Sequence, residues 1–322
     1  MARQRLFDLA WSAGGRWLPD DSVLSFSAQS YSMPGCLSCW SSCTDRRGAM
    51  TAVNYAVAQD VHIAYTVRGR GERVIVVMLG GFIPVDLVDS EPRLARFLQR
   101  LERFGRVVTF NRRGIGLSDP TSVDEPPTLR HWADDVLAVL DAVGATTTTI
   151  VAGLGDVKVA FVVAALAPDR VEQVISINGA VQPLTLVAGL TESALADRYR
   201  QDLRTTSLRT DDQPDQLAWV APSMARDDSF RAWWISAGHR GASPSTARSL
   251  LQVLALADVT IDLRATTCPI LVIQRSDSAA LPVEAGRFIV RNSRMLDSLS
   301  SQELTCCVGS MPKTRWAKSN WR

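Results

Sequence analysis

A short β-branched run, a glycine-rich turn and a long apolar stretch follow one another near the middle of the chain. Residues 148–151 have the length and composition of a buried strand. Residues 158–167 are apolar and rich in alanine before Pro168, which predicts a packed helix. The turn between them reads Val-Ala-Gly-Leu-Gly-Asp-Val. The pattern therefore predicts a strand, a tight turn and a helix.

Similar short apolar runs recur on both sides of this unit. They predict a parallel sheet with helices on both faces. The stretch from about 181 to 261 is expected to place helices over the C-terminal edge of the sheet, where such folds bind ligands. The expected strands are 73–78, 106–110, 147–151, 174–178 and 269–274.

Three segments in the same order resemble the α/β-hydrolase family. Residues 76–82, Val-Val-Met-Leu-Gly-Gly-Phe, resemble its third strand and oxyanion loop, where His-Gly-Phe is usual. Residues 106–118 resemble its D-x-R-G-x-G-x-S segment, with Asn111 in place of the aspartate. Residues 132–144 resemble the helix before the nucleophile elbow and end on a glycine, as helix C-caps often do. The resemblance covers residues 50–292 and implies an α/β-hydrolase fold.

The middle of the chain resembles one bacterial subfamily more closely. Residues 219–223, 230–234 and 242–244 are similar to the lid of hydrolase-like domains that are often fused to class III adenylate cyclases. In such fusions the hydrolase-like domain comes first. No cyclase segment follows residues 50–292 in this sequence.

The elbow carries no nucleophile in this alignment. Aligning 164–168 on the family's Ala-Ala-x-x-Pro helix places the nucleophile at Leu154, with Gly155 as the one-residue alternative. The family's G-x-S-x-G turn lifts a serine above the sheet, and the amide after it supplies half of the oxyanion hole. Neither Leu154 nor Gly155 has a nucleophilic atom.

The other two members of the triad are also displaced. The resemblance puts the acid at Ser278, with Asp277 one residue early, and the histidine after it. The histidines of the chain, His62, His131 and His239, all precede that position. An oxyanion hole built from the Phe82 and Gly155 amides could survive, because backbone amides do not depend on the side chain.

These losses lead to two readings of function. The first is a non-catalytic remnant, which is either a ligand-binding or regulatory module for a small acyl or apolar compound or the product of a decayed gene. The second is an active hydrolase for a carboxylic ester or epoxide that uses Asp156, two places past the aligned position, as its nucleophile. A solvated acid at a helix N-terminus is the simpler interpretation of Asp156, because the helix dipole favours it.

The remaining polar and aromatic candidates have structural interpretations. We expect Ser118 to stabilise its arginine-glycine turn and His131 to lie at the surface or to cap a helix. His239 is expected to be exposed in a lid loop. Trp233 and Trp234 are interpreted as lid core rather than as a substrate platform.

Charge and composition limit the kinds of partner and the location that we expect for the protein. A net charge of +2 argues against a nucleic-acid partner, and no apolar run approaches the roughly 20 residues of a membrane helix. Residues 1–11 lack the apolar stretch of a signal peptide, so we expect a cytoplasmic protein. Cys36 and Cys39 have no second pair at metal-binding spacing, and the sequence indicates neither a metal nor a cofactor. Oligomeric state is left open.

Both ends differ in character from the middle. Residues 1–49 show no sustained period and are expected to form a poorly ordered extension, with Met50 as an alternative start. Residues 293–322 bear no likeness to the family's last strand, histidine loop and helix, so we interpret them as an aberrant tail. Our hypothesis is a reading frame shifted near Asn292. The strand at 269–274 would then lie at an unprotected edge of the sheet.

Overall fold

The computed structural model describes residues 51–187, 189, 217, 218, 221, 223–275 and 281–294. Contacts divide the chain into Met1–Thr51 and Ala52–Arg322, and every element described here belongs to the second unit. The predicted extension at 1–49 and nearly all of the predicted tail at 293–322 lie outside the described residues.

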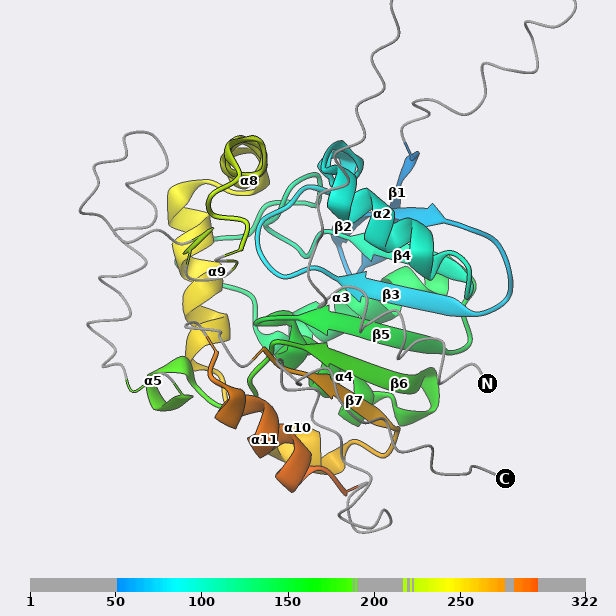
Figure 1. Ribbon diagram of the computed structural model, residues 1–322. Helices are drawn as coiled ribbons and strands as arrows, with labels where there is room; N and C mark the ends of the chain where they lie inside the picture. The colour runs from blue at the N-terminus through cyan, green and yellow to red at the C-terminus, as the bar shows by residue number, and fades with distance from the viewer. Residues whose placement is uncertain are drawn as a thin grey trace, which may run out of the picture. The chain divides into compact units, whose positions relative to one another are not determined.

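A mostly parallel sheet forms the centre of this unit (Figure 1). Among the described residues it has seven strands in the order β1-β2-β4-β3-β5-β6-β7. β2 pairs antiparallel with β1 and β4, and the remaining pairs are parallel. The strands are β1 (Val53–Ala58), β2 (Val61–Arg68), β3 (Val74–Met78), β4 (Arg106–Phe110), β5 (Thr148–Gly153), β6 (Val171–Ile177) and β7 (Ile270–Ile273).

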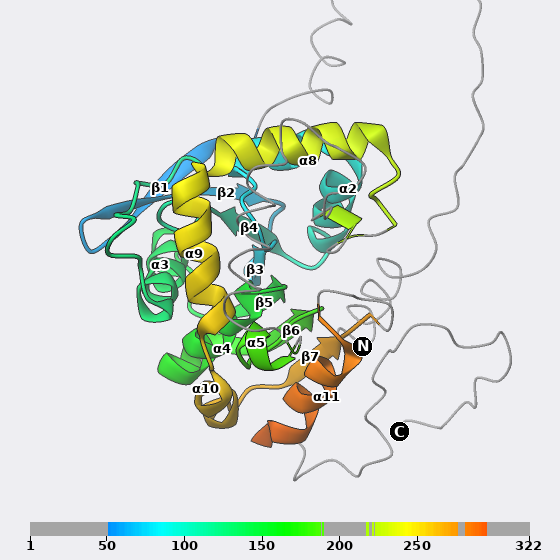
Figure 2. The ribbon, with the colours of Figure 1, turned by 90° about the vertical axis from the view of Figure 1, so that its left-hand side faces the viewer.

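Helices cover both faces of the sheet and its C-terminal edge. Figure 2 shows α3 and α4 on one face and α2 and α11 on the other, while α8 and α9 cross the edge at which the parallel strands end. The described helices are η1 (Val85–Ser90), α2 (Pro92–Leu101), α3 (Leu129–Ala142), α4 (Asp156–Leu166), η2 (Pro168–Arg170), α5 (Leu184–Val187), α8 (Asp228–Gly241), α9 (Pro244–Leu256), α10 (Thr260–Ala265) and α11 (Val283–Asn292).

The central elements of the fold are buried on all sides and consist mostly of apolar residues. Every residue of β3 is buried, as expected for a strand between two neighbours in a sheet covered on both faces. Residues 156–164 of α4 are buried as well, with Phe161 completely inaccessible. α3 instead buries one stripe, which includes Trp132 and Val136. The elbow turn joins β5, which is buried except at Gly153, to the buried helix α4.

The predicted α/β-hydrolase fold is confirmed, and most element bounds differ by only a few residues. β4 has the predicted bounds, whereas β6 begins at Val171, three residues before the predicted start. α4 begins at Asp156 rather than at Lys158. Gly144, with φ of +63°, follows α3 as the expected C-terminal glycine. In the described sheet β7 is the last strand on its side.

Candidate functional site

The turn between β5 and α4 has the backbone of a nucleophile elbow. Leu154 adopts a left-handed conformation with φ of +53°, whereas Gly155 has an ordinary φ of −67°. A leucine in this region is uncommon and strained at a cost of about 1 kcal/mol or more. The neighbouring glycine is needed for space, because a Cβ on Gly155 would lie 3.0 Å from Cδ1 of Leu254. The strained apex of the turn is thus Leu154.

The Leu154 side chain contributes packing and no chemistry. It is half-buried and contacts a small apolar cluster that includes Ala180, Leu281 and Ala285. The Leu154 amide donates to the carbonyl of Ile177 at 3.1 Å. The apex of the elbow is therefore held in place by β6 and by the start of α11.

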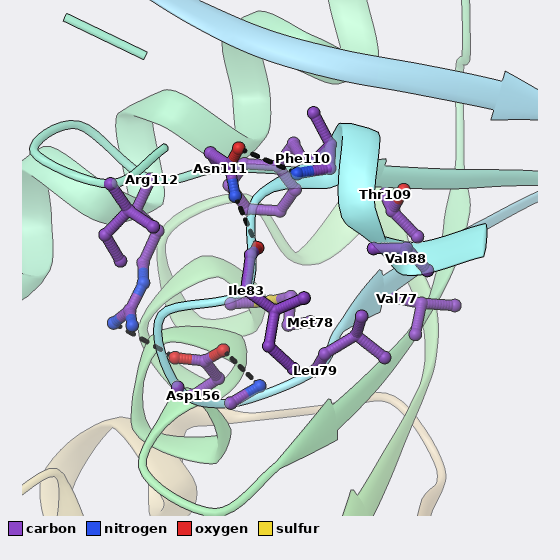
Figure 3. Close-up of a pocket in the computed structure, with 14 residues that line it drawn as sticks. Val77, Met78, Leu79, Ile83, Val88, Thr109, Phe110, Asn111, Arg112 and Asp156 are labelled. Carbon is purple, nitrogen blue, oxygen red and sulfur yellow. Dashed lines mark hydrogen bonds and ion pairs between the residues drawn. The ribbon is translucent and has the colours of Figure 1, made fainter. Parts of the chain in front are cut away.

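Asp156 is buried, so the expectation of a solvated carboxylate is wrong. Its exposed fraction is 5%, and its carboxylate lies between the oxyanion loop and the loop after β4 (Figure 3). Oδ2 accepts a hydrogen bond from the Gly80 amide at 2.9 Å, and Oδ1 lies 3.0 Å from Nη1 of Arg112. Burial raises the pKa of Asp156, whereas Arg112 and the Gly80 amide oppose that rise. Partners from two other segments replace the water that the sequence alone suggested.

Arg112 is the ion-pair partner that sequence reasoning missed. Only 4% of it is exposed, and its guanidinium lies 4.5 Å from the centre of the Trp132 ring. Stacking on an aromatic face suits guanidinium, which is more weakly hydrated than ammonium. The signal available in the sequence was the position of Arg112 inside the motif segment 106–118. The sequence alone did not show that Arg112 pairs with Asp156, which lies 44 residues later in the chain.

The oxyanion loop is shaped by glycines and fixed by Asn111. Gly80 and Gly81 have φ values of +69° and +95°, which favour glycine. The Asn111 side chain accepts from the Val85 amide at 3.0 Å and donates to the Ile83 carbonyl at 2.9 Å. An aspartate, which the family motif has here, could accept from Val85 but could not donate to Ile83.

The two amides expected to form an oxyanion hole keep free donors. Within the described part of the chain, neither the Phe82 amide nor the Gly155 amide has a hydrogen-bond acceptor. Their mutual placement as an oxyanion hole remains a prediction.

A small cavity lies under the oxyanion loop (Figure 3). Its volume is about 30 Å³, which is room for two or three water molecules at roughly 10–15 Å³ each. Asp156, Arg112 and Asn111 supply its polar wall, and β3, β4 and η1 supply the apolar wall. The cavity can hold water beside the ion pair and is too small for an organic ligand.

α8 packs against the oxyanion loop. Cη2 of the Trp234 ring lies 3.7 Å from the point that a Cβ of Gly81 would occupy. A Cβ on Gly241 would lie 1.8 Å from the carbonyl oxygen of Phe82, so only glycine fits at this end of α8. Trp233 donates through Nε1 to Oγ of Ser90 at 2.8 Å. Both side chains are half-buried: Trp233 contacts η1, and Trp234 faces the oxyanion loop.

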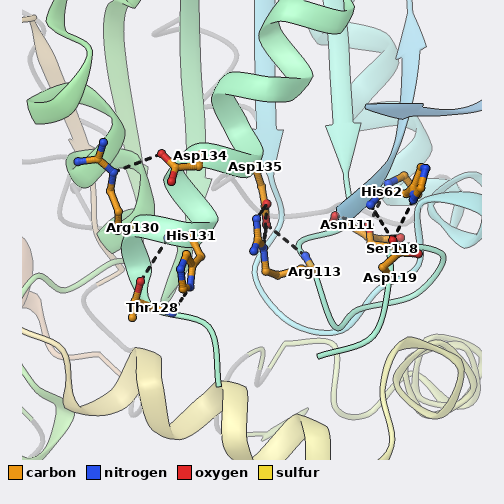
Figure 4. A network of polar contacts seen from close by, with 11 residues as sticks. His62, Asn111, Arg113, Ser118, Asp119, Thr128, Arg130, His131, Asp134 and Asp135 are labelled. Carbon is orange, nitrogen blue, oxygen red and sulfur yellow. Dashed lines mark hydrogen bonds and ion pairs between the residues drawn. The ribbon is translucent and has the colours of Figure 1, made fainter. Parts of the chain in front are cut away.

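His62 and His131 make local polar contacts (Figure 4). Nδ1 of His62 lies 3.0 Å from Asp119, and both side chains are largely exposed. His131 forms a capping box with Thr128 at the start of α3, which confirms the capping interpretation. His239 is exposed as expected, although it belongs to helix α8 and not to a loop. None of these contacts joins a histidine to Leu154 or Asp156.

Ser118 also has the structural role expected of it. Its hydroxyl donates to the Asn111 carbonyl at 2.6 Å and accepts from the Ala64 amide at 2.9 Å, which ties the turn after β4 to β2 (Figure 4). Beside it, Arg113 forms a buried ion pair with Asp135 of α3 at 2.6 Å. Burial raises the pKa of Asp135 against the effect of Arg113.

The acid position of the triad lies outside the described residues. Both Asp277 and Ser278 fall in the stretch 276–280. The residues on either side are joined by Gln274, whose Nε2 donates to the carbonyls of Leu281 at 3.0 Å and Pro282 at 3.2 Å. The prediction for the acid therefore stands untested.

The described residues do not meet the requirements of a metal site, a reactive thiol or a membrane-spanning helix. No group of three or more His, Cys, Asp or Glu side chains there could hold a metal ion. Cys268 is a free, buried thiol, and burial raises its pKa to about 11, which keeps it protonated and unreactive. Cys36, Cys39, Cys43, Cys306 and Cys307 lie outside the described residues. No described helix has the length and hydropathy needed to cross a bilayer.

The strand order, the left-handed turn after β5 and the helices α8 and α9 over the sheet's C-terminal edge together define an α/β-hydrolase fold. No protein-family model matches the chain. The chain is 26% identical over 192 residues to a putative carbamate hydrolase RutD from Caulobacter sp. (strain K31), which covers 58% of this chain and 68% of that protein.

Solved structures agree with this class. A bromoperoxidase from Bacillus anthracis is 19% identical, with a TM-score of 0.61 over 76% of this chain and 88% of its own. An enol-lactonase from Burkholderia xenovorans LB400 is 20% identical, with a TM-score of 0.58 over 75% of this chain and 88% of its own. At these identities the likeness shows the fold.

Proposed function

We propose that this chain is a non-catalytic α/β-hydrolase-fold protein that binds a small acyl or apolar ligand at the elbow. Leu154 carries the proposal. It stands at the strained apex of the turn after β5, where the fold presents its nucleophile, and its side chain has no nucleophilic atom. Removing the nucleophile of a serine triad costs on the order of 10⁶ in turnover.

The backbone of the oxyanion loop and the amide after the elbow apex support the proposal that the chain binds a ligand. Gly80 and Gly81 keep the left-handed backbone of an oxyanion loop, and the Phe82 and Gly155 amides have no acceptor within the described residues. Such amides suit the carbonyl oxygen of an acyl compound. The similar proteins named a carbamate hydrolase and an enol-lactonase act on compounds of this class by their names, which is consistent with the proposal.

The alternative is a hydrolase for an ester or epoxide that uses Asp156 as its nucleophile. Asp156 does border the cavity under the oxyanion loop. Its two oxygens, however, face the Gly80 amide and the Arg112 guanidinium, and 5% exposure leaves little room for a substrate. These contacts favour a structural carboxylate, so the alternative ranks second.

Two assays separate the candidates. In the first, hydrolysis of p-nitrophenyl acetate and butyrate, epoxide opening and labelling by a fluorophosphonate are measured for the wild type, Asp156→Asn and Leu154→Ser. We expect no labelling and no turnover in the wild type. Leu154→Ser should gain less than about a hundredfold, because a serine without a base remains protonated. A wild-type activity abolished by Asp156→Asn would favour the alternative.

The second assay is binding. A series of straight-chain methyl ketones, which offer a carbonyl without a leaving group, is titrated by calorimetry. We expect saturable binding that depends on chain length and weakens in Leu154→Asp, which places a charge beside the carbonyl. If none of the ketones binds, the ligand-binding proposal fails. The likeness of the lid to cyclase-associated proteins and the cytoplasmic location remain predictions.

A further inference from the structure

Lys158 is a buried cation that the elbow chemistry does not use. It lies in the first turn of α4, four residues after Leu154, and only 1% of it is exposed. Its Nζ donates to the carbonyls of Gln182 at 3.0 Å, Leu254 at 2.7 Å and Ala257 at 2.7 Å. An ammonium has three protons, so all of its donors are used.

The three acceptors come from the two ends of the lid. Gln182 follows β6 where the chain leaves the sheet, and Leu254 and Ala257 lie at the C-terminal end of α9. The last carbonyls of a helix have no partner within it and carry the negative end of its dipole. The Val259 amide donates to the Val181 carbonyl at 2.9 Å, which joins the same two segments beside Lys158.

Burial disfavours the charged form of Lys158. Burial lowers the pKa of Lys158 to about 8, and the nearby carboxylate of Asp258 favours the protonated form. The other charged residue at this end of α4, Asp156, is engaged by Arg112. Lysine is almost never fully buried unless it is paired. Three backbone carbonyls from two segments stabilise the Lys158 ammonium, in place of a carboxylate in direct contact.

We propose that Lys158 is a positioning residue that anchors the foot of the lid, at the end of α9, to the elbow helix α4. Only Ala242 and Ser243 separate α8 from α9, and α8 lies against the oxyanion loop. A fixed α9 therefore sets where α8 can lie. The anchor needs no bound ligand, so it stands apart from the proposed ligand-binding function.

The test is hydrogen exchange of the free protein at pH 7, followed in peptides from α8, α9, β3 and β5. In Lys158→Met three carbonyls lose their donor while side-chain bulk is kept. We expect protection in α8 and α9 to fall by about tenfold or more, and protection in β3 and β5 to change far less, as for a local opening. Asp258→Asn, which keeps all three hydrogen bonds, is the matched control and should retain the protection of α9.

Wild-type protein alone provides a second arm if Lys158→Met does not fold. An opened lid would return Lys158 to water, where its pKa is near the ordinary 10.5. Between pH 8 and that value the open state holds more protons, so raising the pH favours the closed state, by at most about tenfold per pH unit. Protection factors of α9, corrected for the intrinsic exchange rate, should therefore rise from pH 8 to pH 9.5.

Three results would overturn the anchor. One is unchanged protection of α9 in Lys158→Met. Another is an equal loss in lid and core peptides, which would mean that Lys158 supports the whole fold and not the lid. The third is a wild-type protection factor for α9 that stays flat or falls above pH 8.

Discussion

Asp156 and Lys158 stand two residues apart at the start of α4, are both buried and carry opposite charges, yet they face different parts of the molecule. Asp156 pairs with Arg112 and the Gly80 amide on the side of the oxyanion loop. Lys158 binds three carbonyls on the side of the lid. The N-terminus of their own helix favours the aspartate and disfavours the lysine. The lysine is compensated by the C-terminal carbonyls of another helix, α9.

Two charges on one helical turn can therefore be stabilised by separate parts of the molecule. A charge at a helix N-terminus is stabilised by what surrounds it in three dimensions, and only part of that comes from its own helix. Breaking each set of contacts separately should therefore give different energies and opposite pH dependences.

The largest effect is expected from Arg112→Met. It leaves the Asp156 carboxylate buried without its counter-ion, which typically costs 3–5 kcal/mol in unfolding free energy. Urea unfolding at pH 7 measures this loss. As control, Glu284→Gln removes an exposed pair with Arg287 on α11 and should change stability by less than about 1 kcal/mol.

The pH dependence of Arg112→Met sharpens the same point. Without Arg112 the pKa of Asp156 in the folded state should rise further above its ordinary value. At pH values above the ordinary pKa, the folded state then binds more protons than the unfolded state. Stability then falls as the pH rises, and the deficit of the variant should shrink toward pH 4. The double variant Arg112→Met/Asp156→Asn should recover part of the loss at pH 7. A deficit that is independent of pH would contradict an unpaired carboxylate.

The next effect concerns Lys158 and has the opposite slope. Its folded pKa of about 8 lies below the ordinary 10.5, so between these values the unfolded state binds more protons and stability rises with pH. The full change is about 3 kcal/mol, from 1.36 kcal/mol per pKa unit. The difference in unfolding free energy between wild type and Lys158→Met, measured from pH 7 to 10.5, isolates it. A difference that stays constant would mean that the lysine is not desolvated in the fold.

The smallest effect is expected from Asn111→Asp. This change restores the residue of the family motif but removes the donor to the Ile83 carbonyl and places a carboxylate beside it. Loss of one buried hydrogen bond with an unsatisfied partner costs about 1–3 kcal/mol. Urea unfolding measures the loss, and Asn111→Ala separates the missing donor from the added charge. If Asn111→Asp is as stable as the wild type, Asn111 does not fix the oxyanion loop.

Much of the fold could be predicted from the sequence because its signals are local. The apolar runs that became β3, β4 and β5 and the glycine after α3 act through strand and helix patterns within a few residues. The elbow was also visible, since Leu154 lies between two glycines that permit a tight turn. The absence of a nucleophile from the elbow could be predicted for the same reason, because the turn is recognised from its own residues.

Only the tertiary structure decided where the buried charges go. By sequence alone Asp156 is an acid at a helix N-terminus, for which water is the default partner. Its environment instead depends on Gly80 and Arg112, which lie 76 and 44 residues away and meet it because β3, β4 and β5 are neighbours in the sheet. Lys158 likewise depends on carbonyls of the lid, up to 99 residues away. Desolvation and ion pairing are properties of the folded surroundings, so local patterns fix the backbone and long-range packing fixes the electrostatics.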